Sequence, residues 1–326
     1  MNRLLLATQH GLVICQPDEE GWREAGVGLA DKNVTSVIAR DGVILAGTTD
    51  GIYRSDDPGQ TFQETSEGLS IRHVRWMGYH PDLPDHEFAG TEPAAIFVSH
   101  DGGLSWRSCS EVTALRDQLK WSLPYSPEAG CVRGFAFLGT RGYAAVEVGG
   151  VLRSDDSGET WRLVEGSDGH PDLEGPPEPL VYPDVHSIGV HAWSRDAVYA
   201  ATGGGLYRST DGGKIWTLIY DCYCRAAWIN PADPQNILLG PADGVDRDGR
   251  IEASNDGGMT WVSASGALDV PWHHHIVERF TQADDEMLAV LSNGELLSAR
   301  FGIWQWRRIL PSVEGVRAAF LFVVEP

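Results

Sequence analysis

The sequence is short of positive charge and of long apolar runs. Its 326 residues contain 25 Lys and Arg against 46 Asp and Glu, a formal net charge of −21. A surface of that sign repels phosphate backbones and anionic lipid, so we expect neither nucleic acid nor membrane as a partner. The first residues, MNRLLLATQHGLV, contain only a brief apolar run. We therefore expect neither a signal peptide nor a membrane span there.

Cysteine is also scarce and has no ordered spacing. The five cysteines are an odd number, and Cys222 and Cys224 form only a Cys-x-Cys pair, which is not the spacing of a zinc site. No His-Glu-x-x-His pattern is present either. We expect reduced thiols, a cytoplasmic protein, no metal and no cofactor.

What the sequence does have is a short motif written five times. The copies are SDDPGQTF (55–62), SHDGGLSW (99–106), SDDSGETW (154–161), STDGGKIW (209–216) and SNDGGMTW (254–261). Ser and Asp side chains can hydrogen-bond the backbone across a turn, and Gly takes the positive φ that other residues resist. Each copy therefore predicts a tight turn whose final aromatic residue anchors the next strand in an apolar layer.

The spacing of these aromatic residues predicts the fold. They lie 44, 55, 55 and 45 residues apart, and similar steps reach Trp306 downstream and Trp22 upstream, after degraded copies of the motif. Seven units of this length, each with four strands, indicate an all-β, seven-bladed propeller formed by one domain over residues 1–326. The expected blades are 33–65, 72–110, 131–165, 184–220, 223–265, 273–310, and 315–325 together with 1–28.

The last of these blades is built from both ends of the chain. Residues 3–14 and 22–25 supply three strands but no innermost strand, and 315–325 (GVRAAFLFVVE) has the composition of one. We expect these segments to close the ring in one blade, which hides the edges of an open sheet.

The repeats resemble those of the Asp-box or BNR-repeat propellers, over nearly the whole chain. That superfamily includes sialidases, sortilin-type domains, xyloglucan-hydrolysing propellers and the photosystem II assembly factor. The resemblance implies that the boxes are structural turns on the face opposite the ligand site.

Aligning the innermost strands reveals a repeated charged position. The second residue of each strand should point in the same direction at the channel mouth. The seven residues are Thr35, Arg75, Arg133, His186, Arg225, His274 and Arg317, with His273 or His275 replacing His274 if the register differs by one. Guanidinium groups match carboxylate, sulfate or phosphate in bidentate geometry. Glu92 and Glu147, at the ends of second strands, could instead pair with Arg75 and Arg133 and satisfy the ring internally.

Two functional hypotheses follow. In the first, the ring binds an anionic small molecule, saccharide or acidic peptide segment without catalysis, as the resemblance to the assembly factor implies. In the second, the protein is a lyase or hydrolase on an acidic substrate such as a uronate-containing saccharide. Arginine would then neutralise the carboxylate, and the acid and base would come from His186, His274, Tyr182 and Tyr223. A sialidase is not supported, because the Arg-Ile-Pro signature is absent and sialidases have six blades.

Long connections are expected over the same mouth. Segments 107–131, 162–184 and 262–272, and the enlarged loop 241–250, exceed what a turn needs. Long loops gathered on one face usually carry function.

Overall fold

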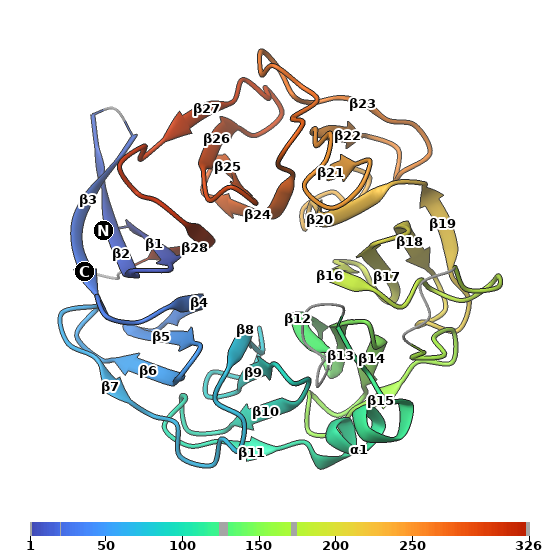
Figure 1. Ribbon diagram of the computed structural model, residues 1–326, viewed down its shortest axis with the longest axis horizontal. Helices are drawn as coiled ribbons and strands as arrows, with labels where there is room; N and C mark the ends of the chain where they lie inside the picture. Colours follow the sequence, from blue (N-terminus) through green and yellow to red (C-terminus); the bar gives the residue numbers. More distant parts are fainter. Residues whose placement is uncertain (1, 20, 124–129, 171–174, 324–326) are drawn as a thin grey trace.

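The computed structural model describes residues 2–19, 21–123, 130–170 and 175–323. Within these ranges the chain forms seven four-stranded antiparallel sheets arranged as the blades of a ring (Figure 1). The seven-bladed propeller expected from the repeat spacing is therefore confirmed.

The first four blades follow the chain in order, each from its innermost strand outward. Blade 1 consists of β4 (Val34–Arg40), β5 (Val43–Thr48), β6 (Gly51–Ser55) and β7 (Gln63–Glu64). Blade 2 consists of β8 (Val74–Tyr79), β9 (Glu87–Thr91), β10 (Ile96–Ser99) and β11 (Arg107–Ser108). Blade 3 consists of β12 (Cys131–Leu138), β13 (Arg141–Glu147), β14 (Gly150–Ser154) and β15 (Arg162–Leu163). Blade 4 consists of β16 (Val185–His191), β17 (Ser194–Thr202), β18 (Gly205–Ser209) and β19 (Thr217–Tyr220).

The remaining blades complete the ring. Blade 5 consists of β20 (Tyr223–Ile229), β21 (Ile237–Ala242), β22 (Glu252–Ser254) and β23 (Val262–Ser263). Blade 6 consists of β24 (Val277–Ala283), β25 (Glu286–Leu291), β26 (Leu296–Arg300) and β27 (Arg307–Ile309). Blade 7 joins β28 (Val316–Val323) to β1 (Asn2–Thr8), β2 (Gly11–Asp18) and β3 (Gly21–Gly28).

Blade 7 is the seam of the ring. In Figure 1 the dark-red β28 lies innermost, beside the dark-blue β1. Their pairing runs from Asn2 opposite Val323 to Thr8 opposite Val316. The predicted closure by both chain ends is confirmed, although residues 324 and 325 of the expected strand lie outside the described residues.

The seven aromatic residues of the repeat explain why the blades pack. Each lies in the apolar cluster between its own blade and the preceding one, and none faces the channel. Trp106, for example, packs with Ile52 and Phe97, and its Nε1 donates to the carbonyl of Thr65 at 2.9 Å. The other six are Phe62, Trp161, Trp216, Trp261, Trp306 and Trp22. The two motif copies that have lost Asp and Gly have therefore kept the residue that holds adjacent blades together.

The five motif copies form one repeated turn between the third and fourth strands. In the copy at 154–161, Ser154 Oγ donates to Asp156 Oδ1 at 2.7 Å and accepts from Gly158 N at 2.8 Å. Thr160 Oγ1 donates to Asp156 Oδ2 at 2.6 Å. Because strands alternate in direction, these turns share one face with the turns between first and second strands. The innermost strands begin on the opposite face, here called the mouth.

The long connection between blades 2 and 3 contains a helix that the sequence analysis did not predict. Helix α1 (Ser110–Leu119) packs Val112 against Ile96 and Trp161, over the outer part of blades 2 and 3. Its first turn is tied to blade 3, because Glu111 Oε1 accepts from Trp161 N at 2.9 Å. Across the described part of the chain, no helix is long and apolar enough to cross a membrane.

Candidate functional site

The charged ring at the mouth sits on seven aligned β-bulges. In every blade the pairing of the innermost strand skips one or two residues shortly after the strand begins. A bulge leaves its extra residue outside the ladder and re-aims its side chain. The residues at these positions are Thr35, Arg75, Arg133, His186, Arg225, Glu278 and Arg317. Six of the seven are those expected from the sequence alignment.

The sixth blade corrects the alignment. His274 was expected in the ring, but β24 begins at Val277 and the ring position belongs to Glu278. His274 is exposed, in the loop that precedes the strand. That loop is held elsewhere: Trp272 pairs with Gly249, and the Trp272 ring stacks on His275 at 5.0 Å. Because Trp272 pairs there and not within the sheet, the strand starts four residues later than the sequence comparison placed it.

One half of the ring neutralises itself. Arg133 donates to Glu147 Oε2 at 2.8 Å and to Glu278 Oε2 at 3.2 Å. Arg225 donates to Glu278 Oε1 and, through Nε, to the Tyr223 hydroxyl at 2.8 Å. We call these residues the paired half.

The carboxyl groups of the paired half are held in their charged form. Burial alone would raise the pKa of Glu278, but the charges of Arg225 and Arg133 outweigh it and lower that pKa below its ordinary value. Burial likewise opposes the charged form of Glu147, but Arg133 and His186 favour it more strongly. The pKa of Glu147 is therefore also lowered. Neither carboxyl group is suited to exchange protons near neutral pH.

The expected catalytic residues do not gather at the mouth as a group. His186 is 1% exposed, its Nδ1 lies 3.1 Å from the carbonyl of Cys224, and its Nε2 lies 3.1 Å from Asp184 Oδ1. The Tyr223 ring is 5.3 Å from the His186 ring, and burial raises the pKa of Tyr223 to about 12. Tyr182 packs instead against the hairpin glycines of blade 4, closest to Gly204. Only His186 and Tyr223 adjoin, and both are enclosed within the paired half.

The other half of the ring is left positive. Arg75 Nε lies 3.4 Å from Glu92 Oε2, the pairing expected from the sequence, but that oxygen receives no hydrogen bond. Arg317 has no ion pair or hydrogen bond with any residue in the described ranges. Burial and the charge of Arg75 both lower the pKa of Arg317, which means that its positive charge is poorly compensated.

Arg279 adds a cation that the sequence analysis missed. It follows Glu278 in β24 and reaches across the channel, donating to the backbone carbonyls of Arg133 at 2.7 Å and His186 at 3.2 Å. Its guanidinium carbon lies 4.1 Å from the centre of the Trp76 ring. Burial and the charge of Arg133 lower its pKa. We call Arg75, Arg279, Arg317 and Thr35 the open half.

A signal for Arg279 was present in the sequence. The residues that follow the ring positions in the other blades are, apart from Trp76, all small: Ser36, Gly134, Ser187, Ala226 and Ala318. Five small residues leave the centre of the channel free for two large side chains, and those are Trp76 and Arg279. Together they divide the mouth from a second cavity of about 360 Å³ deeper in the channel, which has mostly apolar walls.

The open half borders a cavity of about 340 Å³ at the mouth. In the described part of the chain, its lining includes four arginines, Arg75, Arg133, Arg279 and Arg317, against a single carboxylate, Glu278. Uncharged polar groups complete the rim, supplied by Gln9, Thr35, Ser292 and Asn293. No His or Tyr from the described ranges lines this cavity.

The described residues of the long loops do not line this cavity. Its rim comes from the short hairpins of blades 6 and 7, at Ser292–Gly294 and Gln9, and from the starts of the innermost strands. The described residues of 107–131, 162–184, 241–250 and 262–272 contribute nothing to its lining. The expectation that long loops mark the functional site therefore gains no support from this cavity and stays a prediction; residues 124–129 and 171–174 of those loops lie outside the described part.

One side-chain group beside the ring has the composition of a metal site. Glu147, Asp184 and His186 offer ligand atoms within 4.8 Å of one another. However, Arg133 Nη1 already lies 2.8 Å from Glu147 Oε2. A fixed guanidinium at that distance opposes the binding of a second cation.

Comparison with known proteins supports the fold. No known protein-family profile matches the chain. An oligoxyloglucan-reducing end-specific xyloglucanase from Emericella nidulans is 23% identical over 312 residues, covering 80% of this chain and 37% of the fungal protein. The chain therefore spans well under half of that enzyme.

Solved structures give the same result. An ancestral GH74 enzyme superimposes with a TM-score of 0.62 at 16% identity, covering 89% of this chain and 38% of that one. YCF48 bound to D1 peptide superimposes with a TM-score of 0.60 at 15% identity, covering 91% and 89%. YCF48 from Cyanidioschyzon merolae gives 0.59 at 14% identity, covering 91% and 90%. These similarities establish a propeller of the kind found in GH74 enzymes and YCF48.

Proposed function

We propose that the mouth cavity binds a ligand bearing a carboxylate, sulfate or phosphate group, and that the protein is a non-catalytic binding or assembly module. The observation that carries this proposal is the pair Arg279 and Arg317, two cations at one cavity with no carboxylate partner among the described residues. Both side chains are partly buried, and cations withdrawn from water without counter-charges are costly. An anion placed between them removes that cost.

The protein's overall charge makes this cavity selective. A net charge of −21 repels anions from the exterior, so only an anion that can enter the mouth gains from the arginines. The cavity is large enough for a sugar acid or the end of a peptide, and its uncharged rim supplies hydrogen bonds for orientation.

The relatives allow two kinds of partner for this group. YCF48 is seen with D1 peptide, and the xyloglucanase is named for a saccharide. For this chain we propose an acidic peptide segment or a uronate-bearing saccharide, because both present the carboxylate that the open half lacks.

The enzymatic alternative, a lyase or hydrolase on a uronate-containing saccharide, has weaker support. It requires an acid and a base facing the ligand, whereas His186 and Tyr223 lie enclosed beside Arg225. Glu278, the carboxylate that the described residues contribute to the cavity, has a lowered pKa and is held by two arginines. These features favour binding over turnover.

The proposal is tested by calorimetric titration with glucuronate, using glucose as the uncharged control. We expect glucuronate to bind and glucose not to bind. Arg317→Ala should weaken glucuronate binding by about 2–5 kcal/mol, the cost of leaving a partner charge unpaired. The matched control is Arg300→Ala, since Arg300 is exposed near Asp285 and far from the mouth.

Three results would contradict the proposal. These are equal binding of glucose and glucuronate, unchanged affinity in Arg317→Ala, and release of an unsaturated uronate product from a glucuronate-containing oligosaccharide. The last result would establish the lyase instead.

A further inference from the structure

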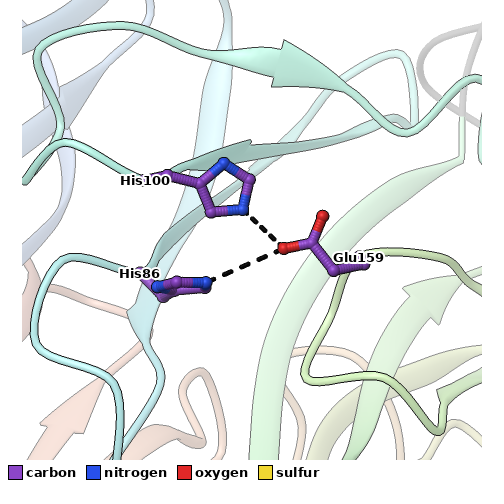
Figure 2. A group of neighbouring side chains, drawn as sticks. All are labelled: His86, His100 and Glu159. Carbon is purple, nitrogen blue, oxygen red and sulfur yellow. Dashed lines mark hydrogen bonds and ion pairs between the residues drawn. The ribbon is translucent and has the colours of Figure 1, made fainter.

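Three side chains from two neighbouring blades converge on the face opposite the mouth (Figure 2). His86 lies in the connection between β8 and β9, and His100 lies in the motif turn of the same blade. Glu159 comes from the motif turn of blade 3. Two of the three therefore sit on turns whose own hydrogen bonds fix the backbone, as at Ser99 and Ser154.

Both imidazoles direct a nitrogen at the same carboxylate oxygen. His100 Nε2 lies 2.5 Å and His86 Nε2 lies 3.7 Å from Glu159 Oε1, and the three ligand atoms all lie within 4.8 Å of one another. The two rings are 4.6 Å apart and nearly perpendicular. The distance from His86 is too long for a hydrogen bond.

We propose that His86, His100 and Glu159 form a binding site for a divalent transition-metal ion of the zinc class. Zinc binds His nitrogen at about 2.0–2.1 Å and carboxylate oxygen at about 2.0–2.2 Å in a tetrahedral arrangement. Two ligand atoms around such an ion are then about 3.4 Å apart. The His86–Glu159 distance is close to this value, and the His100–Glu159 contact needs to open by less than about 1 Å.

The surroundings suit a metal ion. Arg107 Nη2 lies 2.6 Å from Glu159 Oε2, which orients the carboxylate and leaves Oε1 directed at the histidines. The Arg107 side chain is 49% exposed, so water screens its charge, whereas the Arg133 side chain beside Glu147 is only 10% exposed and its repulsion of a cation is not screened. Outer partners of this kind commonly fix metal-ligating carboxylates. The His100 side chain is 41% exposed, so a water molecule or an external ligand can take the fourth position.

The ligand types set the choice of ion. Two imidazoles with one carboxylate favour Zn²⁺, Co²⁺ or Ni²⁺, whereas Mg²⁺ and Ca²⁺ prefer sites made of oxygen alone. An ion here would join blade 2 to blade 3 and stabilise the folded state by mass action. It lies on the face away from the arginine cavity, so this inference does not depend on the proposed function.

The test is titration of tag-free protein, first stripped with a chelator, with Zn²⁺ against a competing indicator. We expect one Zn²⁺ per chain and a rise in the unfolding temperature that Mg²⁺ does not produce. Loss of an outer partner of a metal ligand reduces metal affinity about 10–100-fold. His100→Ala and Glu159→Gln, which remove ligands themselves, should each reduce the affinity for Zn²⁺ by at least that factor. Arg107→Ala should cost about tenfold.

The main competing site is the run His273–His275, where His273 Nδ1 lies 2.8 Å from Asp248 Oδ1. His274→Ala is therefore the matched control and should bind Zn²⁺ like the unmodified chain. The inference is overturned if Zn²⁺ binds no more tightly than Mg²⁺, or if His274→Ala loses binding while His100→Ala keeps it. It is also overturned if the Co²⁺-loaded protein shows a thiolate charge-transfer band, which would assign the ion to cysteine.

Discussion

The two halves of the ring at the mouth share one backbone geometry and differ in the balance of their charges. In the paired half, Glu278 and Glu147 neutralise Arg133 and Arg225. In the open half, Arg279 and Arg317 have no carboxylate partner among the described residues, and Arg75 has only the loose contact with Glu92. The same type of bulge therefore presents neutralised arginines in one half of the ring and uncompensated arginines in the other.

The difference teaches how a repeat fold separates stability from binding. A buried ion pair with both partners present costs little, but it leaves no capacity for a ligand. A cation held by backbone carbonyls and an aromatic ring, as Arg279 is, keeps its charge available. We infer that the paired half stabilises the ring and that the open half serves the ligand.

The largest expected effect comes from removing the central acid of the paired half. Glu278→Gln leaves Arg225 without its carboxylate partner, and breaking such a buried pair costs about 3–5 kcal/mol in the free energy of unfolding. Among the described residues, the same variant removes the one carboxylate that lines the cavity, so glucuronate should bind more tightly. Urea unfolding and calorimetry measure the two quantities. Glu295→Gln is the control, because the Glu295 side chain forms an ion pair with the exposed Arg308 and does not belong to the paired half. Equal stability of the two variants would refute the difference between the halves.

Acid should weaken the paired half first. Because the pKa values of Glu278 and Glu147 are lowered in the folded protein, their contribution is fully present above the ordinary glutamate value of 4.5. It is lost as the pH falls below that value and the folded state binds fewer protons than the unfolded chain. Urea midpoints between pH 6 and about pH 3 should therefore decline more steeply for the unmodified chain than for Glu278→Gln. Parallel declines would show that Glu278 is not charged in the folded state.

A smaller effect on stability and affinity is expected from changing Trp76, whose indole ring lies beneath the Arg279 guanidinium. Trp76→Leu removes a cation–π contact worth about 0.5–2 kcal/mol and leaves the guanidinium free to move. Both the stability and the affinity for glucuronate should fall. The exposed Trp193 provides the control, since Trp193→Leu should change neither quantity. A loss of stability with unchanged affinity would remove Arg279 from the site.

The smallest stability change is expected at Arg317. Since its charge is partly buried and makes no ion pair within the described ranges, Arg317→Ala should not lower the free energy of unfolding and should raise it by no more than about 0.5 kcal/mol. Arg225→Ala, the same substitution at the same bulge in the paired half, should cost several times more. If the two variants lose equal stability, the paired and open halves do not differ in how their arginines contribute to stability.

The propeller, its seam and six of the seven ring positions were predictable because the repeat restates them. The aromatic residue at the end of each motif marks every blade, including those at Trp22 and Trp306 where the motif has decayed. Glu92 and Glu147 could be paired with Arg75 and Arg133 because second-strand ends lie next to first-strand starts.

The misplaced residues show where the repeat gave no information. His274 was assigned to the ring because its segment looked like a strand, whereas the Trp272–Gly249 pairing holds that segment in a loop. Arg279 was missed because side chains alternate along a regular strand, so that the residue after a ring position is expected to point away from the mouth. The bulge at Glu278 breaks this alternation and changes the direction of the Arg279 side chain. The contrast between paired and open halves depends on distances across the channel, which no single strand contains.

Because β28 is the last strand of the ring, the open half is completed only at the end of synthesis and folding. β28 carries Arg317 and joins the ring by pairing with β1, from Asn2 opposite Val323 onward. Contacts between such distant parts of a chain form late, because the loop they close is long. During synthesis on the ribosome, the cavity is incomplete until its last arginine has been added and the ring has shut. A ligand held by Arg317 and Arg75 would then tie β28 of blade 7 to β8 of blade 2, so that occupancy slows the reopening of the ring.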